Sequence, residues 1–434
     1  MSFNRLLYKS RIIVFGDTSG VAMVLDYISK DHVVGIVGAS IRPQYFEGLR
    51  KLAEGISVPL YVQPKVTDET YDQFLMDIKG LTPQLILVNS YSMKLHDNLL
   101  SIPIKGGINI HAALLPQYRG ANPTQWAITN YETETGVTMH EMTSSIDEGG
   151  IIDQRKVNLY FSDTYLNVYE RLTVATKELI ADNLESICEM SWIAHPQDET
   201  AAVYRRRRKP EDGQFDWSWS VIDIYNLIRA IVYPLPGAWF INASNEFEKI
   251  TTYKSLMNVI IMKNQVTNSF EYSFGEIKIR PLNDDNCPEK EQMEADKGLM
   301  SFVNFEAFSS VAAYHEWKEN ILSCQVDCVL FSIEAIPHYD KIGLIQISQF
   351  NWKSKSCLIQ LYNFEGKSLS AVKIIELILS MSKFSFTELK LDKIRVELLT
   401  SQIENIDMYK SMGFEVESKN SQPSNVICMS LKHN

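Results

Sequence analysis

Asn109 and His111 stand two residues apart at the end of a short apolar run, in the stretch GGINIHAALLPQYRGANPTQWAI. Because the side chains of an extended chain alternate between its two sides, an Asn and a His at this spacing lie on the same side. The amide of Asn109 can donate a hydrogen bond to a developing oxyanion, and the imidazole of His111 can accept a proton or, when charged, add a second donor. The pair is therefore a candidate catalytic site.

A candidate third member, Asp147, lies in the stretch MTSSIDEGGIIDQ beside a pair of glycines that allow close approach of the backbone. A carboxylate near an imidazole favours its protonated form and fixes its orientation. Asn, His and Asp together suit acyl transfer to an amine, in which a tetrahedral oxyanion forms and a proton must leave. Spacing alone leaves open that His111 is a hydrogen-bonded structural residue and that Asp147 caps a turn.

The elements that must position these residues are predicted to form an α/β domain. The stretch RIIVFGDTSGVAMVLDYI reads as a strand, a turn and a helix, and further continuous apolar strands follow at HVVGIVGAS and LILVNSYS. Strands of this kind alternating with helices indicate a parallel sheet. The turn GDTSG lacks the G-x-G-x-x-G pattern, so it predicts a tight turn and not an NAD site.

The 434 residues are enough for two or three domains. A basic run followed by Pro and Gly marks a boundary, and a helix and short alternating segments after it predict a smaller mixed α+β unit. The polar stretch NDDNCPEKEQMEADKG is typical of a linker, and strands and helices beyond it predict a mixed α/β sheet domain. The predicted regions are a catalytic domain at 1–203, a smaller unit at 204–282, a linker at 283–298 and a third domain at 299–434.

Composition excludes several classes of partner. The chain has 42 basic and 53 acidic residues, and this net acidic charge argues against a general nucleic-acid or anionic-membrane partner. Its six cysteines lack CxxC spacing, which predicts reduced thiols in a cytoplasmic protein and no metal site. No uncharged apolar run reaches about 18 residues, so neither a membrane span nor a signal peptide is predicted.

The stretch NIHAALLPQYRGANPTQWAI, followed by ETGVTMHEM and SIDEGGII, resembles the catalytic core of the 10-formyltetrahydrofolate-dependent formyltransferases. The resemblance implies a Rossmann-like parallel-sheet domain and transfer of a formyl group from 10-formyltetrahydrofolate to an amine. Asn109, His111 and Asp147 match the catalytic residues of the family. It implies that Asn109 and His111 hold the oxyanion and that His111 with Asp147 manages the proton of the amine, whereas His140 in VTMHEM is expected to be structural.

The next segment, RRRRKPEDGQFDWSWSVIDIYNLIRAIVYPLPGAW, resembles the sugar N-formyltransferases, such as the enzyme that formylates UDP-aminoarabinose. The implied acceptor is a UDP- or dTDP-linked amino sugar, used in surface glycan synthesis such as that of lipopolysaccharide or of a pseudaminic acid-type sugar. Arginines beside the PEDG turn could pair with a nucleotide diphosphate, although each of them could equally belong to a solvated charged face. Two residues of the following helix could face the same cleft, although core packing explains its Tyr equally well. The predicted nucleotide contacts are Arg205, Arg206, Arg207, Arg208, Tyr225 and Asn226.

The last region, with LYNFEGKSLSAVKIIELILS followed by RVELLTSQIENIDMYKSMGFEVES, resembles the GNAT acetyltransferases. In that family a glycine-rich turn at a helix N-terminus binds the pyrophosphate of acetyl-CoA. The implied contacts here are Gly366, Lys367 and Ser368, of which Gly366 matches the family pattern. Tyr409 in YKSMGF matches the general acid of the family, with core packing as its alternative. An active third domain would make the chain a bifunctional formyl- and acetyltransferase.

Two other functions stay open at this stage. A methionyl-tRNA formyltransferase would use the same core, but a tRNA reader is expected to carry a basic surface, and this chain is net acidic. The alternative outside the enzymes is a regulatory protein that binds folate and sugar but has lost turnover. The presence of Asn109, His111 and Asp147 together speaks against that loss of turnover.

Overall fold

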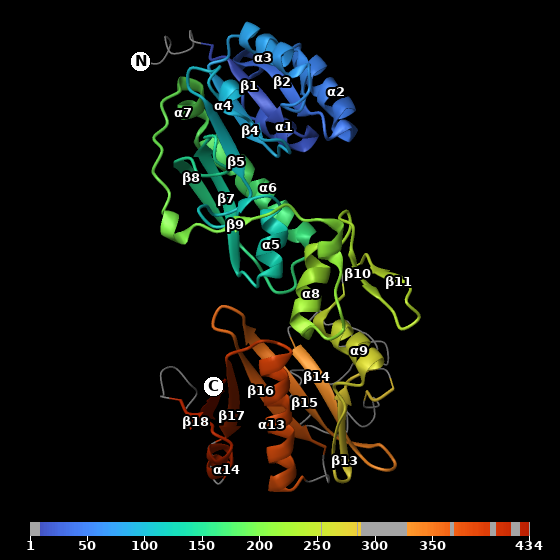
Figure 1. Cartoon of the computed structure of the whole chain (residues 1–434). Helices are drawn as coiled ribbons and strands as arrows, with labels where there is room; N and C mark the ends of the chain where they lie inside the picture. The colour runs from blue at the N-terminus through green and yellow to red at the C-terminus, as the bar shows by residue number, and fades with distance from the viewer. Residues whose placement is uncertain are drawn as a thin grey trace, which may run out of the picture. The chain divides into compact units, whose positions relative to one another are not determined.

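The computed structural model describes residues 9–252, 254–283, 285–287, 328–364, 369–399, 405–417 and 426–433 (Figure 1). Contacts between residues group the chain into two compact units. Unit 1 consists of Met1–Leu159 and Tyr165–Lys209, and unit 2 consists of Tyr160–Thr164 and Pro210–Asn434. The three predicted domains are not tested by this grouping and stay a prediction. Most of the predicted linker, 283–298, lies outside the described residues.

Unit 1 is built on a seven-stranded sheet with the strand order β3-β2-β1-β4-β5-β7-β8. The pairs from β3 to β5 are parallel, and the pairs β5–β7 and β7–β8 are antiparallel. Strands β1 and β4 are buried along their whole length, as their continuous apolar sequences predict for a sheet covered on both faces. The predicted α/β fold class is confirmed. The strands are β1 (Ile12–Gly16), β2 (Val33–Ala39), β3 (Leu60–Gln63), β4 (Leu85–Asn89), β5 (Gly107–His111), β7 (Glu134–Glu141) and β8 (Ile151–Asn158).

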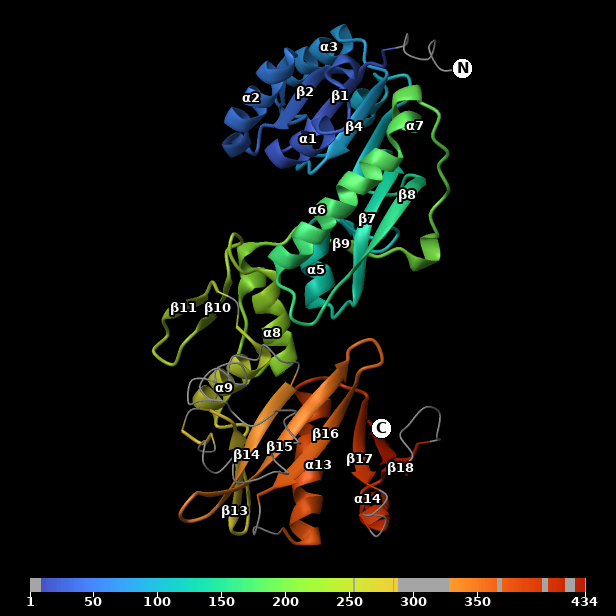
Figure 2. The same cartoon turned by 180° about the vertical axis from the view of Figure 1, so that it is seen from behind.

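Helices cover both faces of this sheet (Figures 1 and 2). Helices α3 and α4 close one face over an apolar cluster that includes Phe15, Phe74 and Leu99. Helices α1, α2 and α6 lie on the other face, where α6 contacts β7 and β8. The helices of unit 1 are α1 (Thr18–Leu25), α2 (Phe46–Ile56), α3 (Tyr71–Gly80), α4 (Asp97–Leu100), α5 (Pro123–Thr129), α6 (Tyr165–Asp182) and α7 (Leu184–Glu189).

The GDTSG turn joins β1 to α1 as a tight turn. Asp17 caps α1 and accepts hydrogen bonds from the backbone N–H of Gly20 and the hydroxyl of Ser19. A Cβ atom at Gly16 or Gly20 would lie 2.4 or 2.3 Å from the carbonyl oxygen of Asn89, at the end of β4. The glycines therefore let α1 begin directly against the strand next to β5, which carries Asn109 and His111.

The described part of unit 2 contains an eight-stranded mixed sheet with the order β12-β13-β14-β15-β16-β17-β19-β18. Neighbouring strands pair antiparallel except β16 and β17, which pair in parallel over three residues only, from Ser356–Lys393 to Leu358–Arg395. The strands are β12 (Tyr272–Phe274), β13 (Ile277–Pro281), β14 (Cys328–Ala335), β15 (Asp340–Asn351), β16 (Ser356–Asn363), β17 (Lys393–Leu399), β18 (Glu415–Val416) and β19 (Val426–Lys432).

Four labelled helices and a hairpin complete the described part of unit 2. Helix α13 packs against β12 and β17, and α8 packs against α9. Strand β13 pairs with β14, so the end of the predicted smaller unit shares one sheet with the predicted third domain. These elements are α8 (Val221–Ala230), α9 (Leu256–Thr267), α13 (Ala371–Thr387), α14 (Ile406–Ser411), β10 (Ala238–Ile241) and β11 (Phe247–Ile250).

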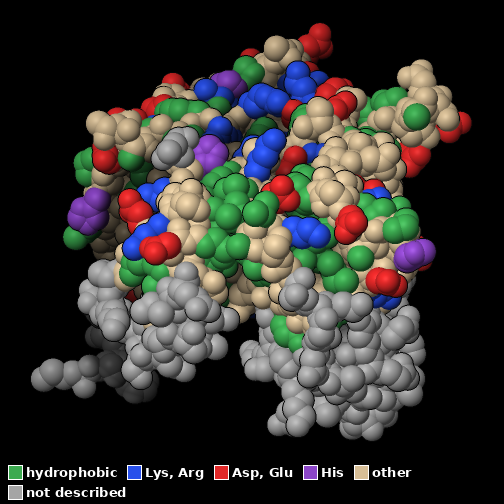
Figure 3. Space-filling view, turned by 90° about the horizontal axis from the view of Figure 1, so that it is seen from below, with side chains coloured by type: hydrophobic (Ala, Val, Ile, Leu, Met, Phe, Trp, Pro, Cys, Tyr) green, Lys and Arg blue, Asp and Glu red, His purple; other side chains and the backbone are tan. Residues whose placement is uncertain are grey.

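Several expectations concern features of the whole chain. Within the described ranges, no helix combines the length and the apolar character needed to cross a membrane. In the same ranges no three His, Cys, Asp or Glu side chains are grouped so as to hold a metal ion. The five cysteines that the structure describes are free thiols. On the face shown in Figure 3, basic, acidic and hydrophobic side chains are interspersed.

Candidate active site

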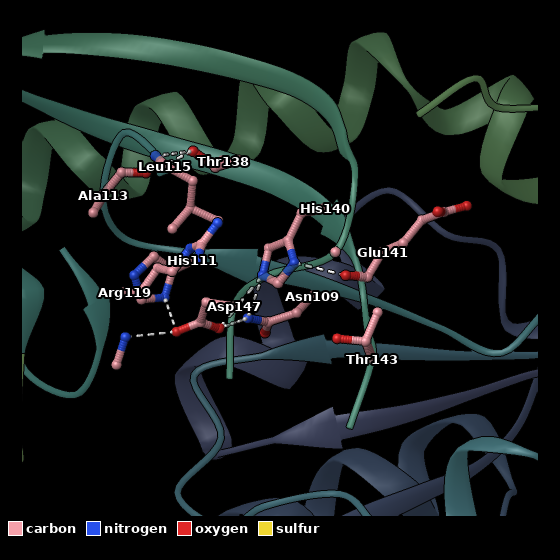
Figure 4. Close-up of polar contacts among 12 residues, drawn as sticks. Asn109, His111, Ala113, Leu115, Arg119, Thr138, His140, Glu141, Thr143 and Asp147 are labelled. Carbon is pink, nitrogen blue, oxygen red and sulfur yellow. Dashed lines mark hydrogen bonds and ion pairs between the residues drawn. The ribbon is translucent and has the colours of Figure 1, made fainter. Parts of the chain in front are cut away.

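The three predicted catalytic residues lie close together where β5 faces the loop between β7 and β8 (Figure 4). Asn109 and His111 lie on β5, and Asp147 lies in the loop. The Asn109 Nδ2 atom is 3.4 Å from Asp147 Oδ1, and the His111 Nδ1 atom is 3.5 Å from Asp147 Oδ2. The alternation of side chains along β5 thus brings Asn109 and His111 to one carboxylate, as their spacing predicts.

Two residues with left-handed backbone conformations, Asp147 and Gly120, direct a carboxylate and a backbone N–H toward this site. Asp147 has φ +57°, and its Oδ2 atom accepts a hydrogen bond of 2.8 Å from the backbone N–H of Gly120. Gly120 lies in the short strand β6 (Arg119–Gly120) and has φ +98°. A Cβ atom there would lie 2.3 Å from the carbonyl oxygen of Arg205 in the neighbouring strand β9 (Tyr204–Arg205), so only glycine fits.

His140 also belongs to the site, although its sequence context suggested only a structural position. The antiparallel register places it opposite Asn109. Its Nδ1 atom lies 2.7 Å from the carbonyl oxygen of Glu141, which only accepts, so Nδ1 donates and Nε2 carries a lone pair. Asn109 Nδ2 donates to that Nε2 at 3.0 Å. The signal that identifies His140 is the strand register, and an isolated sequence does not reveal which residues of two strands face each other.

The hydrogen bonds of His111 define which of its nitrogens is basic. Nε2 lies 2.9 Å from the carbonyl oxygen of Tyr118 and therefore donates to it, which leaves Nδ1 facing Asp147. Tyr118 has φ +58°, a backbone conformation that turns its carbonyl toward the ring. Burial lowers the pKa of His111 below its ordinary value, against the opposing effect of Asp147. The ring is therefore neutral near pH 7 and can take a proton at Nδ1.

Asp147 is the charged member of the site. Burial alone would raise the pKa of its carboxyl, but His111, His140 and the Gly120 N–H together hold that pKa well below its usual range. An ionised carboxylate next to a neutral imidazole stabilises a proton that arrives on the ring. The arrangement can thus donate a hydrogen bond from Asn109, accept a proton on His111 and stabilise the resulting charge with Asp147.

The four predicted arginines lie around α5 and the loop after β4, all in unit 1. The guanidinium groups of Arg205, Arg206 and Arg208 lie 6.0, 5.7 and 4.7 Å from the centre of a Trp126 ring. These are cation–π distances. Arg207 instead donates from Nη2 to the carbonyl oxygen of Ser92 at 2.9 Å, in the loop that follows β4.

Tyr225 and Asn226, the other two predicted nucleotide contacts, lie in the interior of unit 2, each with 1% of its surface exposed. The Tyr225 hydroxyl donates to the carbonyl oxygen of Phe161, and the Asn226 Oδ1 atom accepts from Arg229 Nε at 2.7 Å. The structure therefore explains both side chains without a nucleotide. Core packing was the alternative interpretation for Tyr225, and its contact with Phe161 favours that alternative.

The predicted acetyltransferase residues have a different setting. Gly366, Lys367 and Ser368 lie outside the described residues, between β16 and α13. Tyr409 lies on α14, buried, with its ring at right angles to that of Phe414 at a centre-to-centre distance of 5.6 Å. Burial raises the pKa of Tyr409. A tyrosine with a raised pKa keeps its proton near neutral pH, so it remains able to donate it.

Comparison with protein families gives three matches along the chain. The formyl transferase model matches residues 9–184, and the model of the formyl transferase C-terminal domain matches residues 207–277. Together these two ranges take in more than half of the chain. The acetyltransferase (GNAT) domain model matches residues 282–426.

Comparison with solved structures finds similar proteins among the formyltransferases. A sugar N-formyltransferase from a Shewanella species is 20% identical, with a TM-score of 0.47, and covers 57% of this chain and 99% of its own. A 4-N formyltransferase from Francisella tularensis is 18% identical, with a TM-score of 0.46, covering 56% of this chain and 98% of its own. An N-formyltransferase from Helicobacter canadensis, solved with folinic acid and dTDP-3-aminofucose, is 17% identical, with a TM-score of 0.45, covering 63% and 95%.

Proposed function

Since this chain belongs to the formyl transferase family and carries a C-terminal GNAT acetyltransferase domain, we propose that it transfers a formyl group from 10-formyltetrahydrofolate to the amine of a nucleotide-linked amino sugar. The observation that supports this reaction is the convergence of Asn109, His111 and Asp147 on one partly buried place. A hydrogen-bond donor, a neutral base and an ionised carboxylate are the three kinds of group that suit acyl transfer to an amine.

Asn109 supplies the hydrogen bond to the formyl oxygen. One of its amide N–H groups is held by His140 at 3.0 Å, whereas the other points to Asp147 at the longer distance of 3.4 Å. The longer contact is the weaker one, so this N–H can turn to an oxygen on which negative charge develops. A preorganised donor of this kind typically accelerates acyl transfer by about 10²–10³-fold.

His111 moves the proton. When the amine nitrogen of the acceptor bonds to the formyl carbon, His111 Nδ1 receives a proton from that nitrogen. The charged ring then lies between the Tyr118 carbonyl and the Asp147 carboxylate, both of which stabilise it. The bond from the formyl carbon to the donor nitrogen breaks, and the same proton passes to that nitrogen. Acceptor and donor thus exchange one formyl group and one proton, and His111 returns to its neutral form.

Arg207 is the member of the arginine run that we assign to the acceptor diphosphate. Its guanidinium reaches the carbonyl oxygen of Ser92, and the Arg42 Nε atom lies 3.5 Å from the hydroxyl of the same serine. Two guanidinium groups at one loop suit a diphosphate, which accepts paired N–H donors. The loop follows β4, the direct neighbour of the strand that carries Asn109 and His111. Arg205, Arg206 and Arg208 are instead assigned to Trp126.

We propose acetyl transfer from acetyl-CoA as the reaction of the GNAT domain, with Tyr409 as the general acid toward the departing thiolate. Support comes from the match of residues 282–426 to the acetyltransferase (GNAT) domain model and from the parallel pairing of β16 with β17, which is limited to three residue pairs and ends at Leu358 and Arg395. The two modified amines would belong to one sugar or to successive intermediates. Both donors are cytoplasmic metabolites, and the product would serve surface glycan synthesis in that compartment.

The test is mass spectrometry of UDP- and dTDP-linked amino sugars incubated with the full chain and one donor at a time. A gain of one formyl group with 10-formyltetrahydrofolate alone is the expected result, and the substrate that reacts identifies the nucleotide. A gain of an acetyl group with acetyl-CoA would establish the second activity. Formylation of methionyl-tRNA, or no reaction with any amino sugar, would overturn the proposed acceptor.

A further inference from the structure

Arg119 lies next to Gly120 in β6 and is completely buried, with 0% of its surface exposed. All five of its N–H groups have partners. Nε and Nη2 donate to Gln197 Oε1 at 3.1 and 2.8 Å, and Nη1 and Nη2 donate to the two carboxylate oxygens of Glu199 at 2.9 and 2.7 Å. Nη1 also donates to the hydroxyl of Tyr204 at 2.6 Å. These hydrogen bonds hold the guanidinium in one position, so it can orient the side chains that accept from it.

Gln197 is oriented by this guanidinium. Because its Oε1 atom accepts from Arg119, its amide nitrogen must point to the opposite side. There it donates to the carbonyl oxygens of Asp147 at 2.8 Å and Gly149 at 2.7 Å. Both donors of the amide are used, and both hold main-chain atoms of the loop that carries the catalytic carboxylate.

The two residues of strand β6 thus restrain both the main chain and the carboxylate of Asp147. The side chain of Arg119 acts through Gln197 on the main chain of Asp147, and the backbone N–H of Gly120 binds the Asp147 carboxylate. Asp147 has φ +57°, which a non-glycine residue adopts at a cost and keeps only when its surroundings enforce it. The two hydrogen bonds from Gln197 are such an enforcing contact.

We propose that Gln197, oriented by Arg119, is a positioning residue for the formyl transfer, which fixes the Asp147 loop so that the carboxylate lies between His111 and His140. This inference rests on the proposed function for its kinetic consequence, although its structural consequence does not depend on that function. Gln197 touches no reacting atom and acts through Asp147. The titratable groups that face His111 are Asp147 from the loop and His140 from β7.

Two substitutions test the position. Gln197→Ala removes the link between Arg119 and the loop. Gln197→Glu keeps an oxygen for Arg119 but replaces the two donors by an acceptor that faces two carbonyl oxygens. The control is Asn183→Ala, because Asn183 Nδ2 also makes two hydrogen bonds in unit 1, to Asp153 Oδ2 and to the carbonyl oxygen of Leu179, both at 2.9 Å.

The first readout is the NMR titration of His111 in the full-length protein, assigned with a His111→Gln variant. Asp147 raises the pKa of His111, so displacement of the carboxylate must lower the titration midpoint. We expect a lower midpoint in Gln197→Ala and a wild-type midpoint in Asn183→Ala. In Gln197→Glu the new carboxylate opposes this shift, so the kcat of that variant is the readout. A wild-type midpoint in folded Gln197→Ala would overturn the proposal. Two variants are used because one of them could fail to fold.

The second readout is the kinetics of formyl transfer. The kcat of both Gln197 variants should fall by roughly ten- to a hundredfold, because a catalytic group misplaced by about 1 Å costs rate on that scale. The KM for each substrate should stay within about twofold, since Gln197 is assigned no substrate contact. An unchanged kcat would overturn the kinetic part. If the wild-type protein transfers no formyl group at all, the proposed function fails, whereas the titration of His111 still decides whether Gln197 positions Asp147.

Discussion

Two polar clusters of the molecule, one partly buried and one buried, differ in how tightly their members contact one another. In unit 1 the Asp147 carboxylate lies 3.4 to 3.5 Å from Asn109, His111 and His140. In unit 2 the contacts of Arg229 with Asn226 and with the carbonyl oxygen of Asp163 are 2.7 and 2.9 Å long. The contacts of Asp147 with these three side chains are at or beyond the upper limit of hydrogen-bond length, although its Oδ2 atom also accepts a bond of 2.8 Å from Gly120. The contacts of Arg229 with Asn226 and Asp163 have ordinary hydrogen-bond lengths.

The difference distinguishes the proposed catalytic residues from structural polar residues. A buried group whose hydrogen bonds are short and complete holds the fold and has little left to offer a substrate. Long contacts among buried groups leave donors and acceptors that a reacting molecule can engage. Asn109 is partly exposed whereas Asn226 has 1% of its surface exposed, so the two asparagines differ in exposure as well as in their contacts. Mutation at each place tests whether these differences separate the two roles.

The largest expected effect is that of Asn109→Ala on the rate. The variant loses the donor to the formyl oxygen, and kcat should fall by about a hundredfold or more. Steady-state kinetics with 10-formyltetrahydrofolate and the reactive amino sugar measure this loss. The KM for the folate should stay nearly constant, because the lost contact strengthens as charge develops. A kcat within threefold of wild type would refute the role of Asn109.

The matched change in unit 2 is Asn226→Ala, which should affect stability and not rate. It leaves Arg229 Nε without its partner in a buried place, at a cost of about 1–3 kcal/mol. Hydrogen exchange of the backbone amides of α8 should become faster, while formyl transfer stays within twofold of wild type. A rate loss comparable to that of Asn109→Ala, with α8 still protected, would make Asn226 a substrate contact after all and would remove the distinction between the two clusters.

Much of unit 1 could be predicted from the sequence, because local patterns specify it. Continuous apolar strands alternating with helical segments predicted the parallel sheet, GDTSG predicted a tight turn, and the N-x-H spacing placed Asn109 and His111 together. His140 and Gln197 could not be found in this way. His140 enters the site through strand register, and Gln197 enters through a contact with a residue 78 positions earlier in the chain. Neither contact leaves a local pattern.

The arginine run shows the same limit in a surface feature. Four successive arginines predicted an anion site, but the sequence does not tell which guanidinium is turned toward it. Three of the side chains lie against Trp126, and Arg207 reaches the loop after β4. Rotamers of neighbouring residues on an irregular segment diverge according to their tertiary contacts, so this choice requires the folded structure.

A smaller effect is expected for Arg207→Ala, which tests substrate binding next to the catalytic cluster. Loss of one charge-assisted contact to the diphosphate should raise the KM for the nucleotide sugar by about ten- to a hundredfold, on the scale of about 1.5–3 kcal/mol for a hydrogen bond to a charged group. The kcat should change little. Arg50→Ala is the matched control, because Arg50 is exposed on α2 and contacts only Glu47 among the ion pairs of the described chain. An unchanged KM in Arg207→Ala would move the diphosphate elsewhere.

The smallest effect concerns the protonation of His111. Burial lowers its pKa, so the NMR titration midpoint in the folded protein should lie below the value of about 6.5 found in unfolded chains. The urea-unfolded protein provides the reference for the same ring. Because His111 accepts a proton in its neutral form, a lower pKa keeps the base active to more acidic pH. Asp147→Asn removes the charge that opposes the effect of burial, and it should lower the midpoint further. A midpoint above the unfolded value would mean that the carboxylate outweighs burial, and a midpoint above the pH of the assay would leave His111 charged in the resting enzyme and unable to receive the proton of the amine.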